Sequence, residues 1–151
     1  MGIINITPDS FSGDGLLNSE LSIQDKYKIA ENLGIEFLDI GCVSTRPKYK
    51  KIKTEEEIER FDFFLKNINY KFKYSIDSTN INVIEKAIEA DFLVINDVSG
   101  LKDKKIINKA KSAEVGLILV HRNSSSQEIH EIKEYKDVVE EVKYQLDEKI
   151  E

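Results

Sequence analysis

Polar side chains that could bind a ligand stand at the ends of five short hydrophobic runs in this 151-residue chain. The runs are rich in β-branched residues, which is typical of strands. The polar residues are Asn5, Asp39, Asp77, Asn96 and His121. In parallel α/β proteins ligands bind at the C-terminal ends of the strands. The pattern therefore predicts one site assembled from several loops.

The loop after the first run is polar except for one aromatic residue. Pro8 stiffens it, Gly13 and Gly15 give it freedom to move, and Phe11 is a large apolar side chain within it. On composition alone, an ordinary turn with Phe11 folded onto the core is the better interpretation, because Pro, Asp, Ser and Gly are common turn residues.

The loop after the second run contains Ser-Thr-Arg at residues 44–46, close to Gly41. Hydroxyls, backbone N–H groups and a guanidinium are the groups that bind phosphate or pyrophosphate. An ordinary loop in which Arg46 pairs with a carboxylate is an equally good interpretation. The other two arginines are Arg60, which reads as a helix-surface residue, and Arg122, to which no role is assigned.

An acid and an amide end the third and fourth runs, at Asp77 and Asn96. Together they could bind the donor and acceptor edge of a heterocycle. Capping of the next helix is the alternative, and it is preferred for the adjacent Ser78 and Asp97. Asp77 and Asn96 can do both. The single cysteine, Cys42, has no second cysteine with which to bind a metal, and no such role is expected for it.

The elements that must position these residues alternate in type along the chain. Strands are predicted over residues 2–6, 36–40, 72–77, 92–96 and 116–120, with helical patterns after each of them. A capping box, Thr54 to Glu57, predicts the start of one helix. The arrangement is that of a parallel α/β protein. Periodicity leaves open whether the sheet is doubly wound or belongs to a (β/α)8 barrel.

Composition excludes several classes of protein. Lys and Arg number 22 against 28 Asp and Glu, giving a net charge of −6, which argues against a nucleic-acid partner. The longest apolar stretch, residues 115–120, is far shorter than the roughly 20 residues of a membrane span. One cysteine and the lack of a signal-like N-terminus predict a cytoplasmic protein without a membrane partner.

Four segments together resemble the dihydropteroate synthase family of folate biosynthesis. The first is long and specific, and the other three follow in the order and approximate spacing of the family. They are Asn-Ile-Thr-Pro-Asp-Ser-Phe-Ser at 5–12, Ser-Thr-Arg-Pro at 44–47, Ser-Ile-Asp-Ser at 75–78 and Ile-Asn-Asp-Val at 95–98. The resemblance extends over the whole chain. It favours the barrel over the doubly wound sheet.

The resemblance implies an incomplete (β/α)8 TIM barrel over residues 1–151, with about five parallel strands and without strands six to eight. It implies a transferase that joins 6-hydroxymethyl-7,8-dihydropterin pyrophosphate to p-aminobenzoate and releases pyrophosphate, with Mg²⁺ as cofactor. By itself the chain is expected to be inactive, and its partner would be a separate chain that supplies the other strands, or a second copy of itself. The alternative is a non-catalytic remnant that binds pterin or pyrophosphate.

The motifs also imply roles for individual residues. Asn5 would meet Mg²⁺ or the pyrophosphate, and Thr45 and Arg46 would contact the pyrophosphate. Asp77 and Asn96 would bind the pterin edge, and Arg46 and Asp77 would be the catalytic residues.

The same motifs imply the site of the second substrate. Phe11 and Pro47 would form its wall, and Asp9 and Ser10 would lie in the loop that closes over it. The chain departs from the family's pattern where Cys-Val replaces Gly-Glu at residues 42–43 and where Lys48 replaces a glycine. A related family of pterin-binding methyltransferases fits the first motif less well.

Overall fold

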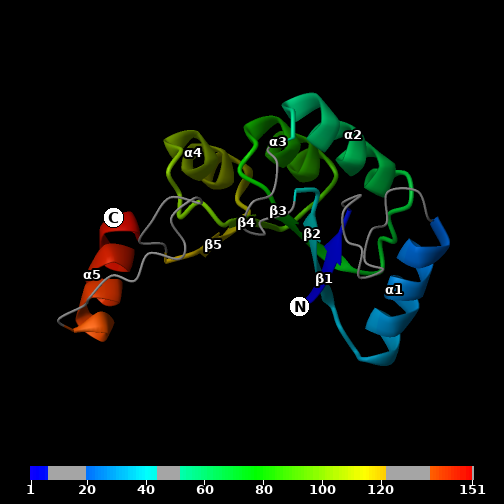
Figure 1. Cartoon of the computed structure of the whole chain (residues 1–151), viewed down its shortest axis with the longest axis horizontal. Coiled ribbons are helices and arrows are strands. Elements are labelled where there is room, and N and C mark those ends of the chain that lie inside the picture. The colour runs from blue at the N-terminus through cyan, green and yellow to red at the C-terminus, as the bar shows by residue number, and fades with distance from the viewer. Residues whose placement is uncertain (7–19, 44–51, 122–136, 151) are drawn as a thin grey trace.

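The computed structural model describes residues 1–6, 20–43, 52–121 and 137–150, and in these ranges parallel strands alternate with helices (Figure 1). The strands are β1 (Gly2–Asn5), β2 (Phe37–Gly41), β3 (Lys73–Asp77), β4 (Val94–Asp97) and β5 (Gly116–Leu119). The helices are α1 (Glu20–Asn32), α2 (Thr54–Leu65), α3 (Ile81–Glu89), α4 (Lys104–Ala113) and α5 (Val138–Ile150). The strand boundaries lie within two residues of the predicted ones.

The order of the strands distinguishes the two architectures that periodicity left open. Each strand pairs in parallel with the next one along the chain, in the order β1-β2-β3-β4-β5. A doubly wound sheet instead reverses its order at a switch point, whereas a barrel adds its strands in sequence. Helices α2, α3 and α4 lie over one face of the sheet, and α5 lies beyond β5 (Figure 1). The predicted incomplete (β/α)8 barrel is confirmed.

The face of the sheet beneath the helices forms the core. Side chains alternate between the two faces of a strand, so residues paired in register share a face. Four such isoleucines, each at most 1% exposed, cross the sheet beneath the helices: Ile4, Ile40, Ile76 and Ile95. Four aromatic rings from α2, β3 and the segment before β4 pack beside them with centroids 5.1 to 6.4 Å apart: Phe61, Phe64, Tyr74 and Phe92.

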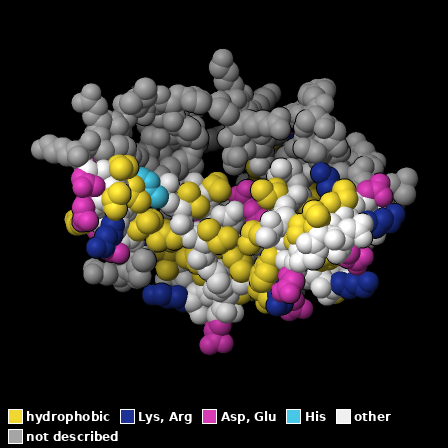
Figure 2. Space-filling model, turned by 90° about the horizontal axis from the view of Figure 1, so that it is seen from below, with side chains coloured by type: hydrophobic (Ala, Val, Ile, Leu, Met, Phe, Trp, Pro, Cys, Tyr) yellow, Lys and Arg dark blue, Asp and Glu magenta, His cyan; other side chains and the backbone are white. Residues whose placement is uncertain are grey.

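The opposite face, which we call the helix-free face, has no described helix over it. Figure 2 views the molecule from this side and shows apolar side chains with acidic ones among them. Toward the C-terminal ends of the strands its residues are polar or small: Asn5, Asp39, Gly41, Ser75, Asp77 and Asn96. Because successive side chains of a strand point to opposite faces, the same strands form an apolar core on one face and a polar surface on the other.

Two predictions about α2 are wrong. The capping box does not form, because Lys53 is the N-cap residue, no side chain caps the helix, and Glu57 instead accepts hydrogen bonds from Ser78 and Asn80. Arg60 is not a surface residue, since it is only 2% exposed and bonds to the backbone of Cys42. Glu57 bonds to polar groups of another element instead of the start of its own helix, and Arg60 bonds to a backbone carbonyl instead of water.

Among the described helices, none combines the length and the apolar composition that crossing a membrane would require.

Candidate functional site

Three of the predicted site residues come together at one edge of the sheet. Asn5, Asp77 and Asn96 end or nearly end their strands, and the strand pairing places them in one row with Gly41 on the helix-free face. The row follows from the parallel arrangement, which brings all strand C-termini to the same edge. Asn5 is exposed, and Asp77 and Asn96 are half-buried, so all three can reach a ligand.

Gly41 leaves room for two of these side chains to approach each other. A Cβ atom at this position would lie 3.0 Å from Asn5 Oδ1 and 3.5 Å from Asp77 Oδ2. The first distance is tighter than real Cβ contacts normally are, so even alanine would displace Asn5. The glycine thus creates a small polar recess, with an amide oxygen on one side and a carboxylate oxygen on the other.

Asn96 is held in one orientation by a buried carboxylate. Its Nδ2 donates a hydrogen bond of 2.9 Å to Oδ2 of Asp39, which is only 6% exposed. The NH₂ group of Asn96 is the donor of this bond, so it faces Asp39. No other described residue bonds to the carbonyl Oδ1 or the second N–H of Asn96, so both can face a ligand. Asp39 therefore belongs to the site, although its position at a strand end was the only signal in the sequence.

Two further polar atoms lie buried beside this pair. Asp39 Oδ1 and Ser75 Oγ have no hydrogen-bond partner within the described part of the chain. The two residues are paired in register on the helix-free face. Buried polar atoms are normally satisfied, and exceptions deserve a functional explanation. They extend the polar character of the site below the row of strand-end residues.

Asp77 has an unusual acidity. Burial is the main cause, followed by the negative charges of Asp39, Glu57 and Asp97, and together they raise its pKa from 3.8 to about 7. Near neutral pH the carboxyl group is therefore divided between its protonated and ionised forms. It can donate a hydrogen bond in one form and accept in the other. Such a group is suited to a heterocycle that carries both donors and acceptors.

The preferred prediction that Ser78 and Asp97 cap the next helix is wrong, although both have structural roles. Asp97 is fully buried and accepts from the backbone N–H groups of Ser99 and Leu101, so it stabilises the turn after β4. The N-cap residues of α3 and α4 are instead Asn80 and Asp103. The side chains of Ser78 and Asp97 thus form hydrogen bonds within the protein and are not placed in the candidate site.

Cys42 and His121 also have structural surroundings. Cys42 is fully buried, and burial raises the pKa of its thiol well above the usual range, which does not suit a nucleophile. His121 Nε2 lies 2.9 Å from Oε1 of Gln145 and links the end of β5 to α5. Asp9, Ser10, Phe11, Thr45, Arg46 and Pro47 lie outside the described residues.

The donor set can be compared with what Mg²⁺ requires. In the described ranges no three His, Cys, Asp or Glu side chains form a group that could hold a metal ion by themselves. Mg²⁺, however, often takes only one or two protein oxygens and completes its shell with water and substrate phosphates. The amide oxygen of Asn5, beside the recess at Gly41, fits such a site.

The comparisons with known proteins agree with this geometry. The family model described as "Pterin binding enzyme" matches residues 1–151. The dihydropteroate synthase of Clostridium beijerinckii is 36% identical over 146 residues, which are 94% of this chain and 51% of that protein.

Solved structures show the same fold. The Yersinia pestis dihydropteroate synthase, in complex with a sulfonamide drug, superposes with a TM-score of 0.85 at 25% identity, over 99% of this chain and 55% of its own. The Xanthomonas albilineans dihydropteroate synthase, solved with 4-aminobenzoic acid, superposes with a TM-score of 0.79 at 30% identity. The superposition covers 99% of this chain and 54% of that protein. The chain therefore spans about half the length of the dihydropteroate synthases that it matches.

Fold and site together define a barrel-type parallel α/β protein with a polar site at the strand C-termini. The family match covers the whole chain, and the chain belongs to the family of pterin-binding enzymes. The resemblance to dihydropteroate synthase predicted from the four motifs is confirmed.

Proposed function

We propose that this chain provides the β1–β5 part of a dihydropteroate synthase site and binds 6-hydroxymethyl-7,8-dihydropterin pyrophosphate at the row of strand-end residues. The observation that carries the proposal is the pairing of Asp77, whose pKa lies near 7, with an Asn96 amide fixed by Asp39. A pterin edge alternates N–H donors with nitrogen and oxygen acceptors. A carboxyl group and an oriented amide on neighbouring strands offer the matching partners.

The pyrophosphate would lie toward Asn5, Thr45 and Arg46. Arg46 supplies a guanidinium for the departing pyrophosphate, and Thr45 supplies a hydroxyl and a backbone N–H. Asn5 would hold Mg²⁺, which supplies positive charge to the phosphate oxygens when it is bound. Because the side chain of Asn5 is uncharged, binding of Mg²⁺ there would depend on the negative charge of the phosphates. Arg46 and Asp77 are the proposed catalytic residues.

The reaction would need little from the protein beyond positioning and electrostatics. Stabilisation of the leaving group at the β2 loop would let an arylamine displace pyrophosphate from the pterin. That arylamine is p-aminobenzoate, for which Phe11 and Pro47 would form the wall. Asp9 and Ser10 would lie in the loop that closes over it. These four roles rest on the motifs alone.

The chain by itself is proposed to bind without turnover. Its 151 residues contain none of the Asp-Pro-Gly, Ser-Arg-Lys and Arg-x-His segments that the resemblance leads us to expect on strands six to eight. Those segments would have to come from residues outside the 151 of this sequence. The alternative function is a non-catalytic module, located like the enzyme in the cytoplasm, that binds pterin or pyrophosphate.

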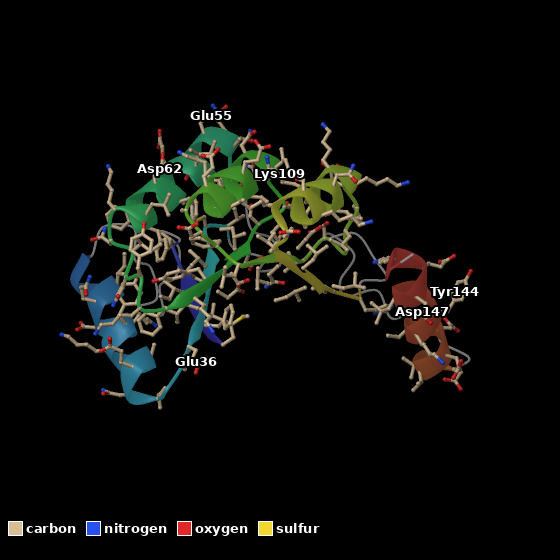
Figure 3. The ribbon with its side chains drawn as sticks, turned by 180° about the vertical axis from the view of Figure 1, so that it is seen from behind. Glu36, Glu55, Asp62, Lys109, Tyr144 and Asp147 are labelled. Carbon is tan, nitrogen blue, oxygen red and sulfur yellow. The ribbon has the colours of Figure 1, made fainter. Side chains whose placement is uncertain are left out.

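Calorimetry and a turnover assay on the purified chain test the proposal. Pterin pyrophosphate with Mg²⁺ should bind, and Asp77→Ala and Arg46→Ala should each weaken binding by tenfold or more, about 1.4 kcal/mol. Glu55→Gln is the matched control, since Glu55 is exposed and points outward from α2 (Figure 3). Unaltered binding in both site variants would refute the assigned roles. Dihydropteroate formed by the chain alone would refute the claim of binding without turnover.

A further inference from the structure

Two ionisable side chains of α2 lie in the apolar layer between the helices and the sheet. Glu57 is 7% exposed and Arg60 is 2% exposed, and both lie on the helix face that buries Phe61 and Phe64. A buried charge costs several kcal/mol unless polar partners compensate it. The partners that these two residues have found therefore indicate what they do.

Glu57 bonds to the turn that follows Asp77. Its Oε1 accepts from Ser78 Oγ at 2.6 Å, and its Oε2 accepts from Asn80 Nδ2 at 3.0 Å. Ser78 Oγ in turn accepts from the backbone N–H of Asn80 at 3.0 Å. Asn80 also caps α3 through the backbone N–H of Asn82. One carboxylate thus fixes the whole turn from the end of β3 to the start of α3.

Arg60 bonds to the end of the neighbouring strand. Its Nη1 donates to the carbonyl oxygen of Cys42 at 2.9 Å, and its Nη2 donates to the carboxylate of Glu56 on the same helix. Cys42 follows the last residue of β2 and precedes the segment that contains Thr45 and Arg46. The guanidinium therefore ties α2 to the point where the proposed phosphate loop departs from the sheet.

The two contacts meet at one pair of strand ends. Gly41 of β2 and Asp77 of β3 are paired in register. A Cβ atom placed on Gly41 would lie only 3.0 Å from Asn5 Oδ1 and 3.5 Å from Asp77 Oδ2. The relative positions of Asn5 and Asp77 around the glycine therefore depend on where the two strand ends lie. Both strand ends are held by the same helix.

We propose that Glu57 and Arg60 are positioning residues of the candidate site. Glu57 sets the position of Asp77 through the following turn, and Arg60 sets the end of β2 and the start of the phosphate loop. The inference rests on the proposed function for what is positioned, but the contacts themselves do not depend on it. Neither side chain contacts the ligand.

Other contacts of α2 separate positioning from stability. Phe64 packs against Tyr74 and Phe92 in the core, away from the recess. Asp62 pairs with Lys86 of α3 at the outer surface (Figure 3). Truncation of Phe64 should destabilise the fold without altering the strand ends. Phe64→Leu is therefore the stability-matched control for variants of Glu57 and Arg60.

The first test is a nuclear magnetic resonance titration of the Asp77 carboxyl group without ligand. The charges around Asp77 come from Asp39 on β2, Glu57 on α2 and Asp97 on β4. Glu57→Gln removes one of these charges and one acceptor of the turn, so the pKa of Asp77 should fall below about 7. Phe64→Leu should leave it near 7. An unchanged titration in Glu57→Gln would overturn the role of Glu57.

The second test is amide hydrogen exchange at Ile6, whose N–H donates to the carbonyl oxygen of Gly41 at 2.7 Å. Arg60→Lys keeps the charge but not the two-pronged donor group. Exchange at Ile6 should accelerate by about tenfold relative to amides of α3, because local openings expose individual amides. Phe64→Leu should change both sets equally. If Arg60→Lys changed the exchange rates of Ile6 and of the α3 amides equally, the positioning role of Arg60 would be overturned.

The third test is calorimetry with pterin pyrophosphate and Mg²⁺. Both positioning variants should bind at least about tenfold more weakly than Phe64→Leu. Binding equal to that of Phe64→Leu would contradict the link to the site. A wild-type chain that binds no ligand would refute the proposed function instead, and the two ligand-free measurements would still decide whether α2 fixes the strand ends.

Discussion

The two faces of the sheet are built from the same five strands, yet they differ in almost every property. Beneath the helices an unbroken row of isoleucines is excluded from water. On the helix-free face, the corresponding C-terminal positions carry amides, carboxylates, a hydroxyl and a glycine: Asn5, Asp39, Gly41, Ser75, Asp77 and Asn96. Burial of apolar area stabilises the fold, whereas half-buried polar groups cost stability unless something binds them. The first face holds the chain together and the second is suited to chemistry.

The comparison implies that stability and ligand binding can be changed separately. Adjacent residues on a strand point to opposite faces, so one step along β3 moves from Ile76 in the core to Asp77 in the site. Substitutions on one face should alter the free energy of unfolding. Substitutions on the other should alter affinity.

The largest effect should come from the packing face. Ile76→Ala removes a fully buried side chain and leaves a cavity, so the free energy of unfolding should fall by about 3 kcal/mol. Urea denaturation followed by circular dichroism measures the loss, and Ile76→Val should lose only about 1 kcal/mol. Losses of equal size in the two variants would show that the isoleucine row is not tightly packed.

Asp39→Ala should show the opposite behaviour. The change removes the acceptor that orients Asn96, so pterin pyrophosphate should bind about tenfold more weakly, about 1.4 kcal/mol. The free energy of unfolding should change by less than about 1 kcal/mol, because one Asp39 oxygen makes no hydrogen bond within the described residues. Calorimetry and urea denaturation on the same sample separate the two. A large loss of stability with unchanged affinity would reverse the assignment of the two faces.

The acidity of Asp77 predicts a pH-dependent effect on stability. Its pKa is about 7 in the folded chain against an ordinary value of 3.8. Between these values the native state binds more protons than the unfolded state, so the free energy of unfolding falls as the pH rises toward 7. Above this range the Asp77 carboxyl group causes no further decrease. Asp77→Asn should lack this contribution. Urea midpoints of the two proteins across that range measure it, and parallel curves would contradict the raised pKa.

The smallest effect should be at the outer surface of the helices. Asp62 and Lys86 form an ion pair whose side chains are about two-fifths exposed, at 42% and 37%. Asp62→Asn should therefore cost less than about 1 kcal/mol and leave ligand binding unchanged. Thermal denaturation at low and high salt detects the difference. A loss as large as that of Ile76→Ala would mean that this surface ion pair contributes as much as a core side chain.

The sequence predicts the fold well because its signals are local. The β-branched runs and helical stripes are legible one element at a time, and Asp77 and Asn96 converge because parallel strands end at one edge. The motifs then distinguish the barrel from the doubly wound sheet. Sequential strand pairing confirms that choice.

Contacts between distant residues are what the sequence conceals. Charged residues normally lie at the surface, so Glu57 and Arg60 read as a cap and an exposed side chain. Their burial depends on Ser78 and on the carbonyl of Cys42, each in another element. The bond from Asn96 to Asp39 likewise joins residues 57 positions apart. Such pairings become visible only once the strands are in register.

The central claim is that the ligand binds at the strand ends of the helix-free face. The most direct measurement is a titration of 6-hydroxymethyl-7,8-dihydropterin pyrophosphate, with Mg²⁺, into the isotope-labelled chain while backbone amide resonances are recorded. The account predicts that, among the described residues, the largest shifts occur at Asn5, Gly41, Asp77 and Asn96. Shifts confined to the outer surfaces of α2, α3 and α4, or no shifts at saturating ligand, would contradict it.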